Sequence, residues 1–169
     1  SVVGRLPEPL SDLGAAAVRA VLLESSFRGF AVADLREVPV APAAEGGPAI
    51  LERQLAAAAE LLAGLPFDTA LVAVPGASAA HVVTLPFADP RRLEQTVAFE
   101  VEGQIPFDLS EVAWDWQPLQ LSEGHAELLV AVQRKGELAA LLAGLAPLGV
   151  DPRWVLPPGP ALAALFGAG

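Results

Sequence analysis

The chain has 169 residues, of which 53% are apolar and 18% charged, and its net charge is −10. This length fits one domain or two small subdomains that share a core. The acidic balance argues against binding nucleic acid or anionic lipid through a broad basic face, although a basic protein partner is compatible with it. The absence of cysteine excludes disulfides, thiolate metal sites and cysteine nucleophiles.

The first half of the chain predicts a hairpin, a helix and a further strand. Residues 18–24 and 30–38 are rich in apolar and β-branched residues, with serine and glycine between them, as is typical of a β-hairpin. A helix is predicted from Pro48, whose missing N–H is harmless at a helix start, to Gly64. Its apolar residues recur at three- and four-residue spacing and form one face: Leu51, Leu55, Ala58, Leu62 and Leu65. Residues 69–74 form the next strand.

The second half begins with a strand over residues 81–85 and a helix that starts at Pro90. The apolar stripe of this helix recurs every four residues: Leu93, Val97, Val101 and Ile105. Pro106 cannot continue the helix, and it disfavours helical geometry at the preceding residue. The sequence therefore predicts an abrupt corner at this proline.

Two strands and a helix are predicted after the corner. The strand over residues 112–119 places Trp114 and Trp116 on one face. A short Ser-Glu-Gly turn leads into an apolar strand over residues 126–133. Leucines at helical spacing then predict a helix over residues 138–148. No apolar run reaches the roughly 18–20 residues that a membrane-spanning helix needs.

Asp12 and Gly14 form the one candidate phosphate or metal site. In an Asp-x-Gly hairpin the aspartate holds a metal or its water, and the glycine lets the backbone approach an oxygen. Here the positions where a hydroxyl and a lysine would assist hold three alanines and Arg19. Pro7 and Pro9 also make the preceding segment a poor strand. A simple turn closed by a side-chain hydrogen bond is the alternative.

No catalytic arrangement is predicted. His81 and His125 have no close carboxylate or hydroxyl partner in the sequence, and the glutamates of the helix after Pro90 are interpreted as solvated charges. There is no nucleophile elbow, no GxGxxG and no GxxxxGK[ST] pattern. The sequence therefore predicts neither an enzyme nor a metal centre.

Four aromatic residues in the second half of the chain are the better functional candidates. On the helix after Pro90, Phe99 projects about 180° from the centre of the apolar stripe, given the advance of about 100° per residue. Phe107 follows the corner, and Trp114 and Trp116 follow it in turn. Each of these residues either packs within the domain or anchors a partner, and both interpretations stay open at this point.

Residues 85–119, LPFADPRRLEQTVAFEVEGQIPFDLSEVAWDWQPL, resemble the PilM/GspL family. These are actin-like cytoplasmic proteins of type IV pilus assembly and type II secretion. The matching features are the Phe-Glu-x-Glu helix, the Gln-Ile-Pro-Phe stop, the Glu-Val pair and the aromatic strand. Further matches occur in order along most of the chain: DLGAAAVRAVLLE, TALVAVPG and ELLVAVQRKGELAALLAGLAPLGVDP.

The resemblance implies an α+β fold, the first lobe of an actin-like (ribonuclease H-like) fold without the second lobe. A base subdomain, residues 1–79, would carry an inserted β-α-β-β-α subdomain, residues 80–150. Residues 151–169 would form a tail that returns to the base. Because the second lobe is absent and the Asp-x-Gly loop differs from the family pattern, Asp12 and Gly14 are expected to be remnants of a nucleotide site. No cofactor is expected, although full-length relatives could bind ATP.

The resemblance also implies a function, a non-enzymatic assembly scaffold of a bacterial type II secretion inner-membrane platform. Such a protein would be cytoplasmic, peripheral to the inner membrane, and would bind the secretion ATPase and platform proteins. The alternatives are a PilM-like pilus protein whose groove binds a membrane partner's tail, an actin-like ATPase half, and a self-associating homodimer. The residues expected to bind a partner or to fix that surface are Phe99, Ile105, Pro106, Phe107, Trp114 and Trp116.

Overall fold

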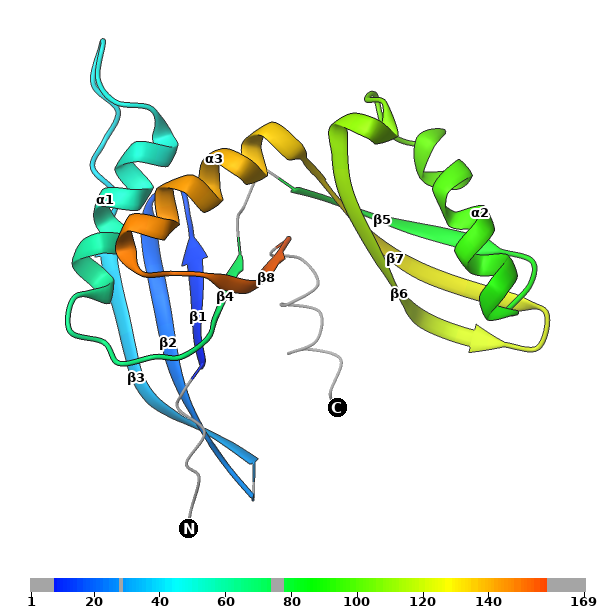
Figure 1. The fold of residues 1–169 in the computed structure, drawn as a ribbon, viewed down its shortest axis with the longest axis horizontal. Helices are drawn as coiled ribbons and strands as arrows, with labels where there is room; N and C mark the ends of the chain where they lie inside the picture. The colour runs from blue at the N-terminus through cyan, green and yellow to red at the C-terminus, as the bar shows by residue number, and fades with distance from the viewer. Residues whose placement is uncertain (1–7, 28, 74–77, 158–169) are drawn as a thin grey trace. The chain divides into compact units, whose positions relative to one another are not determined.

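The computed structural model describes residues 8–27, 29–73 and 78–157 (Figure 1). The chain divides into two compact units. Unit 1 combines Ser1–Pro75 with Ala139–Gly169, and unit 2 is the segment Gly76–Leu138. The boundaries predicted from the sequence lie after residues 79 and 150, whereas this division lies after residues 75 and 138.

Unit 1 is built on a five-stranded sheet of order β3-β2-β1-β4-β8. β2 (Ala17–Ser26) pairs antiparallel with β3 (Gly29–Pro39), which confirms the predicted hairpin. β1 (Glu8–Leu13) lies at the centre and pairs antiparallel with β2 and parallel with β4 (Ala70–Ala73). β8 (Pro152–Leu156), which the sequence did not predict, extends the sheet by pairing parallel with β4.

The expectation that prolines prevent a strand before Asp12 is wrong. β1 contains Pro9, which lies opposite Leu22 of β2. The parallel pairing of β1 with β4 begins only at Leu10, so β1 is unpaired on that side at the proline. A proline is tolerated where one side of a strand is open, because the missing N–H then costs no ladder hydrogen bond. Pro7 lies outside the described residues.

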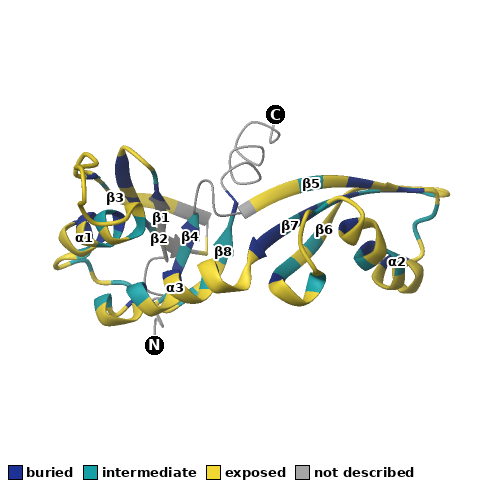
Figure 2. Ribbon diagram, turned by 90° about the horizontal axis from the view of Figure 1, so that it is seen from above, coloured by how far each residue is buried: buried dark blue, intermediate teal, exposed yellow. Residues whose placement is uncertain are grey.

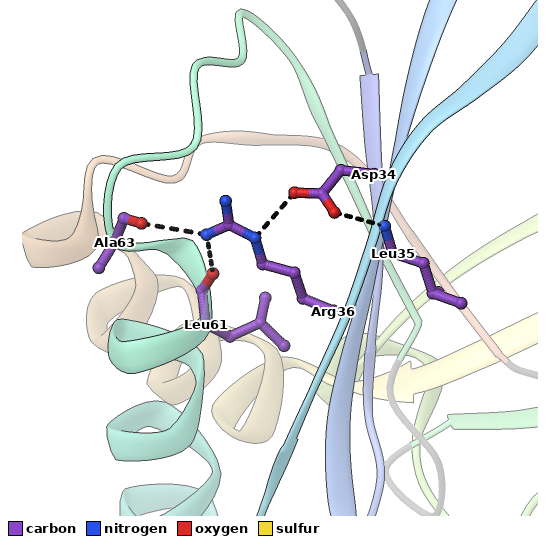
Figure 3. Close-up of polar contacts among 5 residues, drawn as sticks. All are labelled: Asp34, Leu35, Arg36, Leu61 and Ala63. Carbon is purple, nitrogen blue, oxygen red and sulfur yellow. Dashed lines mark hydrogen bonds and ion pairs between the residues drawn. The ribbon is translucent and has the colours of Figure 1, made fainter.

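α1 (Ile50–Leu62) packs on this sheet through a face whose buried residues are Gln54, Ala57, Ala58 and Leu61. The helix is confirmed, but of the predicted apolar stripe only Ala58 is fully buried, so the buried face is turned away from that stripe. The C-terminal carbonyls of α1 are satisfied by a side chain from β3 (Figure 3). The Nη1 of Arg36 donates to the carbonyl oxygens of Leu61, at 3.2 Å, and Ala63, at 3.1 Å, and its Nε donates to Asp34 at 2.9 Å. Cations are favourable at a helix C-terminus, so this arginine ties the hairpin to the end of α1.

α3 (Lys135–Leu145) buries Leu141 and Leu145 and continues into a short 3₁₀ turn over Ala146–Leu148. Gly149 ends it with a φ of 73°, a left-handed conformation that favours glycine, as predicted. At Gly144 a β-carbon would overlap the Leu55 side chain of α1, so the two helices approach closely at this position. Among the described residues, no helix is long and apolar enough to cross a membrane.

Unit 2 is a three-stranded antiparallel sheet of order β5-β7-β6, with α2 (Pro90–Glu102) on one face. β5 (Ser78–Leu85), β6 (Val112–Ser122) and β7 (His125–Arg134) match the three strands predicted there. β7 lies in the middle and carries alternating buried residues (Figure 2). The core between α2 and the sheet consists of Val83, Leu85, Leu93, Val97, Val101, Val112, Ala126, Leu128, Val130 and Val132.

The close approach of α3 to α1 can be tested with two glycines of one helix. Gly144→Ala places a methyl group where it overlaps Leu55 Cδ1 and lies 3.1 Å from Cδ2 and 3.2 Å from Cγ. A methyl group at Gly136 meets no atom within 4 Å. Both substitutions gain the same helix propensity, so overpacking decides the difference. We expect Gly144→Ala to be about 1–3 kcal/mol less stable than Gly136→Ala in denaturant unfolding. Equal stabilities would show that α3 does not pack tightly on α1.

Candidate partner-binding groove

The corner after α2 forms one wall of the site. α2 ends at Glu102, earlier than the stripe predicted, with Gly103 as its C-cap. The N–H of Ile105 still donates to the Val101 carbonyl at 3.2 Å, so this side chain stays against the core while Pro106 turns the chain outward. The predicted stop at the proline is therefore a short loop that begins three residues before it.

Two polar contacts hold the segment that follows the corner. Asp108 caps the short 3₁₀ helix η1 (Leu109–Glu111), and its Oδ1 accepts a hydrogen bond from the Ser110 N–H at 2.7 Å. Hydrogen bonds from the Ser110 side chain and backbone lower the pKa of Asp108 below its ordinary value of 3.8. The Lys135 Nζ donates to the Ser110 carbonyl at 2.8 Å. This hydrogen bond, which no pattern in the sequence indicated, ties the corner to the start of α3.

An open groove of about 330 Å³ lies between this corner and the sheet. In the antiparallel register Ala79 lies opposite Val132, and Val112 lies opposite Arg134. Directly opposed residues share a face, and side chains alternate along a strand, so these four residues lie on the face that carries α2. The apolar floor formed by Ala79, Val112 and Val132 is joined by Ile105, Pro106 and Phe107 from the corner.

Charged side chains lie at one end of the groove. The Arg134 guanidinium lies over the Phe107 ring, 5.1 Å from its centroid, and 3.6 Å from a carboxylate oxygen of Glu137. A cation over an aromatic face is a favourable contact, and it limits the directions that the ring can take. The sequence offered no sign of this pair, because only the path of β6 and β7 brings the two residues together.

The predicted partner-binding residues separate into two groups by exposure. Ile105, Trp114 and Trp116 are half-buried and pack against the core of unit 2. Phe99 is 74% exposed and Phe107 38% exposed, so these two aromatic side chains present apolar area to solvent. Pro106 is also exposed. The choice between core and surface that the sequence left open is therefore decided differently for the tryptophans and the phenylalanines.

The Asp-x-Gly segment spans the end of β1 and the residue after it, and a side chain of α1 hydrogen-bonds to it. The buried Gln54 Nε2 donates to the carbonyl oxygens of Leu13, at 2.8 Å, and Gly14, at 3.2 Å. These carbonyls are therefore already engaged with the protein itself. Asp12 is in β1, but its side chain lies outside what the structure describes. Among the described residues, no group of three or more acidic or histidine side chains could hold a metal ion.

Comparison with solved structures gives two informative matches. The chain superposes on a "PilM-PilN type IV pilus biogenesis complex" with a TM-score of 0.73 and 25% identity, over 90% of this chain and 48% of that one. It superposes on the cytoplasmic domain of EpsL, an inner-membrane component of the Vibrio cholerae type II secretion system, with a TM-score of 0.60 and 19% identity. That match covers 89% of this chain and 57% of the other.

The resemblance to the PilM/GspL family is confirmed. No family model and no curated protein matches the sequence. The PilM/GspL likeness therefore rests on the structure and on the motif around the corner. The chain spans about half the length of the solved structures it matches, as expected for a single lobe of a PilM/GspL-like fold, and the predicted actin-like fold class is confirmed.

The cap at Asp108 predicts a pH dependence of stability. Because hydrogen bonds lower the pKa of the folded-state carboxyl, its stabilising contribution is present above pH 3.8 and is lost as the pH falls through the folded-state value. We expect Asp108→Ala to lower the melting temperature at neutral pH and to match the wild type in strong acid. Ser110→Ala keeps the backbone N–H that donates to Asp108. It should therefore lower the melting temperature at neutral pH by less than Asp108→Ala does. A difference that persists unchanged in strong acid would exclude this origin.

Proposed function

We propose that the chain is part of an inner-membrane assembly component of bacterial type II secretion or type IV pilus biogenesis. In this proposal it acts as a non-enzymatic scaffold, cytoplasmic and peripheral to the membrane. The observation that carries the proposal is the likeness to the PilM of a PilM–PilN complex over 90% of the chain, at 25% identity. The likeness to the EpsL cytoplasmic domain supports the same fold and leaves the choice between the secretion and pilus branches to experiment.

The groove of unit 2 is the site that we assign to a protein partner. Its apolar floor and its charged end resemble the composition of binding sites, where apolar contacts give affinity and a few polar groups fix orientation. Phe107 supplies exposed apolar area at the wall, while Arg134 holds the ring in place. Trp114 and Trp116 act through the core by fixing β6, rather than by touching the partner.

Phe99 provides a second apolar contact point on the outer side of α2. An aromatic residue that is 74% exposed on a helix, and outside the core of unit 2, contributes little to the packing of that unit. Exposed aromatic residues are enriched at interaction sites. By analogy with the solved PilM-PilN complex, we assign a platform protein of the PilN kind as the first partner to be tested. The second, a cytoplasmic secretion or pilus ATPase, is what the family resemblance implies.

The scaffold role rather than an ATPase role is supported by the Asp-x-Gly loop. The two residues after Gly14 are alanines, which have no hydroxyl or amine to donate to a phosphate. The carbonyl oxygens of Leu13 and Gly14, which could otherwise bind a metal ion, accept hydrogen bonds from Gln54. A phosphate site needs donors that converge on the anion, and the described part of this loop offers few. We therefore propose that this chain binds no nucleotide.

The groove can be tested with two matched phenylalanine substitutions. Phe107→Asp places a charge on the groove wall, and Phe27→Asp places the same charge at a side chain that is 97% exposed on the hairpin tip of unit 1. We expect Phe107→Asp to weaken binding of the organism's own PilN-like platform protein, or of its secretion or pilus ATPase, by about tenfold or more in calorimetry. Phe27→Asp should bind as the wild type does, and both should keep the wild-type circular dichroism.

Loss of folding in Phe107→Asp would show that Phe107 is a core residue, and the groove assignment would fail. Undiminished binding in a folded Phe107→Asp variant would move the interface elsewhere. If neither candidate partner binds the wild-type chain, the assembly role itself would be contradicted.

Nucleotide binding provides an independent test of the non-enzymatic role. We expect titration of Mg-ATP into the chain to give no binding heat and no rise in melting temperature, because a ligand that binds the folded state would raise it. Binding that is present in the wild type and absent in Asp12→Ala would support the alternative of an actin-like ATPase half.

A further inference from the structure

Three of the four sheet edges in the described chain carry devices that prevent pairing with another strand. β3 contains Asp34, Arg36 and Glu37. β8 is short and begins with Pro152. β6 contains Pro118 and a shift in register just after it. Charges, prolines and bulges are the usual means by which natural sheets block their edges, because an open edge presents unpaired N–H and C=O groups.

β5 is the edge strand without such a device. Its eight residues, SAAHVVTL, contain no proline, no carboxylate, no lysine and no arginine. It pairs with β7 residue by residue from Ser78 to Leu85 with no shift in register, so it is regular along its whole length. Ala79, Ala80, Val82 and Thr84 are exposed. The outer side of β5 is therefore a regular template for one more strand.

We propose that β5 pairs antiparallel with β5 of a second copy of this chain, which joins two three-stranded sheets into one of six strands. Among the described edge strands, β5 is the one at which a second copy would meet no acidic or basic strand residue, since β3, β6 and β8 each carry at least one. Each copy carries a net charge of −10, so two copies repel wherever acidic surfaces meet. β5 itself has no charged carboxylate, lysine or arginine to oppose the approach. This proposal is independent of the groove and of the assembly role.

The residues of β5 suit a two-fold pairing centred on Val82. Val82 then lies opposite its own copy, Ala80 opposite Thr84, and His81 opposite Val83. None of these pairs contains like charges, and β-branched residues recur at the centre, where cross-strand pairs stabilise a sheet. Val83 points into the core at 2% exposed, whereas Val82 is 57% exposed on the other face. Pairing would therefore bring the two Val82 side chains together.

One strand pair makes a small interface beside the total of about 1,200–2,000 Å² that a stable complex buries. Weak, reversible dimerisation is therefore the expected behaviour, with a dissociation constant in the micromolar range or above. Isologous pairing of identical edges also closes on itself, so the expected product is a dimer and not a filament.

Sedimentation velocity of the full chain, over about a hundredfold range of concentration, tests the proposal. The wild type should pass reversibly from monomer to dimer. Val82→Lys and Val82→Glu should each weaken dimerisation by about tenfold or more, because like charges then face each other. An equimolar mixture of the two variants should recover the dimer, since opposite charges meet across the two-fold axis. Gln117→Lys on β6 is the matched control and should dimerise like the wild type.

A wild type that stays monomeric throughout the range would overturn the proposal. So would a dimer that Val82→Lys leaves intact, or one that Gln117→Lys disrupts equally. Circular dichroism shows whether each variant folds. Thr84→Lys, at another exposed position of β5, replaces Val82→Lys if that variant unfolds, and it should weaken the dimer in the same way.

Discussion

The contact between α2 and its sheet determines the arrangement of unit 2. Leu93, Val97 and Val101 are almost completely buried, and each such side chain contributes about 1.5–3 kcal/mol when it leaves water. One helix covers only one face of three strands, so this small core has no second layer within the described unit. The position at which α2 ends therefore sets where the corner, η1 and β6 begin. Both the groove wall and the exposed aromatic residues follow from this single packing contact.

The spacing of apolar residues in the sequence was enough to locate most elements, because amphipathic helices and half-buried strands each have a characteristic period. The strand β1 was missed since Pro9 counts against a strand locally, whereas the structure leaves that position unpaired on one side. β8 was missed because a strand of five residues that begins with a proline carries little pattern. Neither error depends on propensity alone. Each reflects a tertiary pairing partner that lies far away in the sequence.

In the candidate site too, the sequence predicted what depends on neighbouring residues and missed what depends on distant ones. A helical wheel identified Phe99 as outward-facing, and the structure agrees, since that inference uses only neighbouring residues. The contact of Phe107 with Arg134 depends on the path of two strands and could not be read from spacing. The tryptophans posed the opposite difficulty, because their size fits either a core or an interface, and only the position of the core of unit 2 assigns them.

Unit 2 interrupts unit 1, and this affects the order in which a ribosome delivers the two. β4 is synthesised before unit 2, whereas its parallel partner β8 and the helix α3 come after it. Unit 2 is continuous, so all of its core residues emerge while the sheet of unit 1 still lacks its last strand. During that interval β4 has an unpaired edge, which is the kind of surface that promotes misassembly in nascent chains. The length of the inserted unit therefore sets how long the edge of β4 stays unpaired during synthesis.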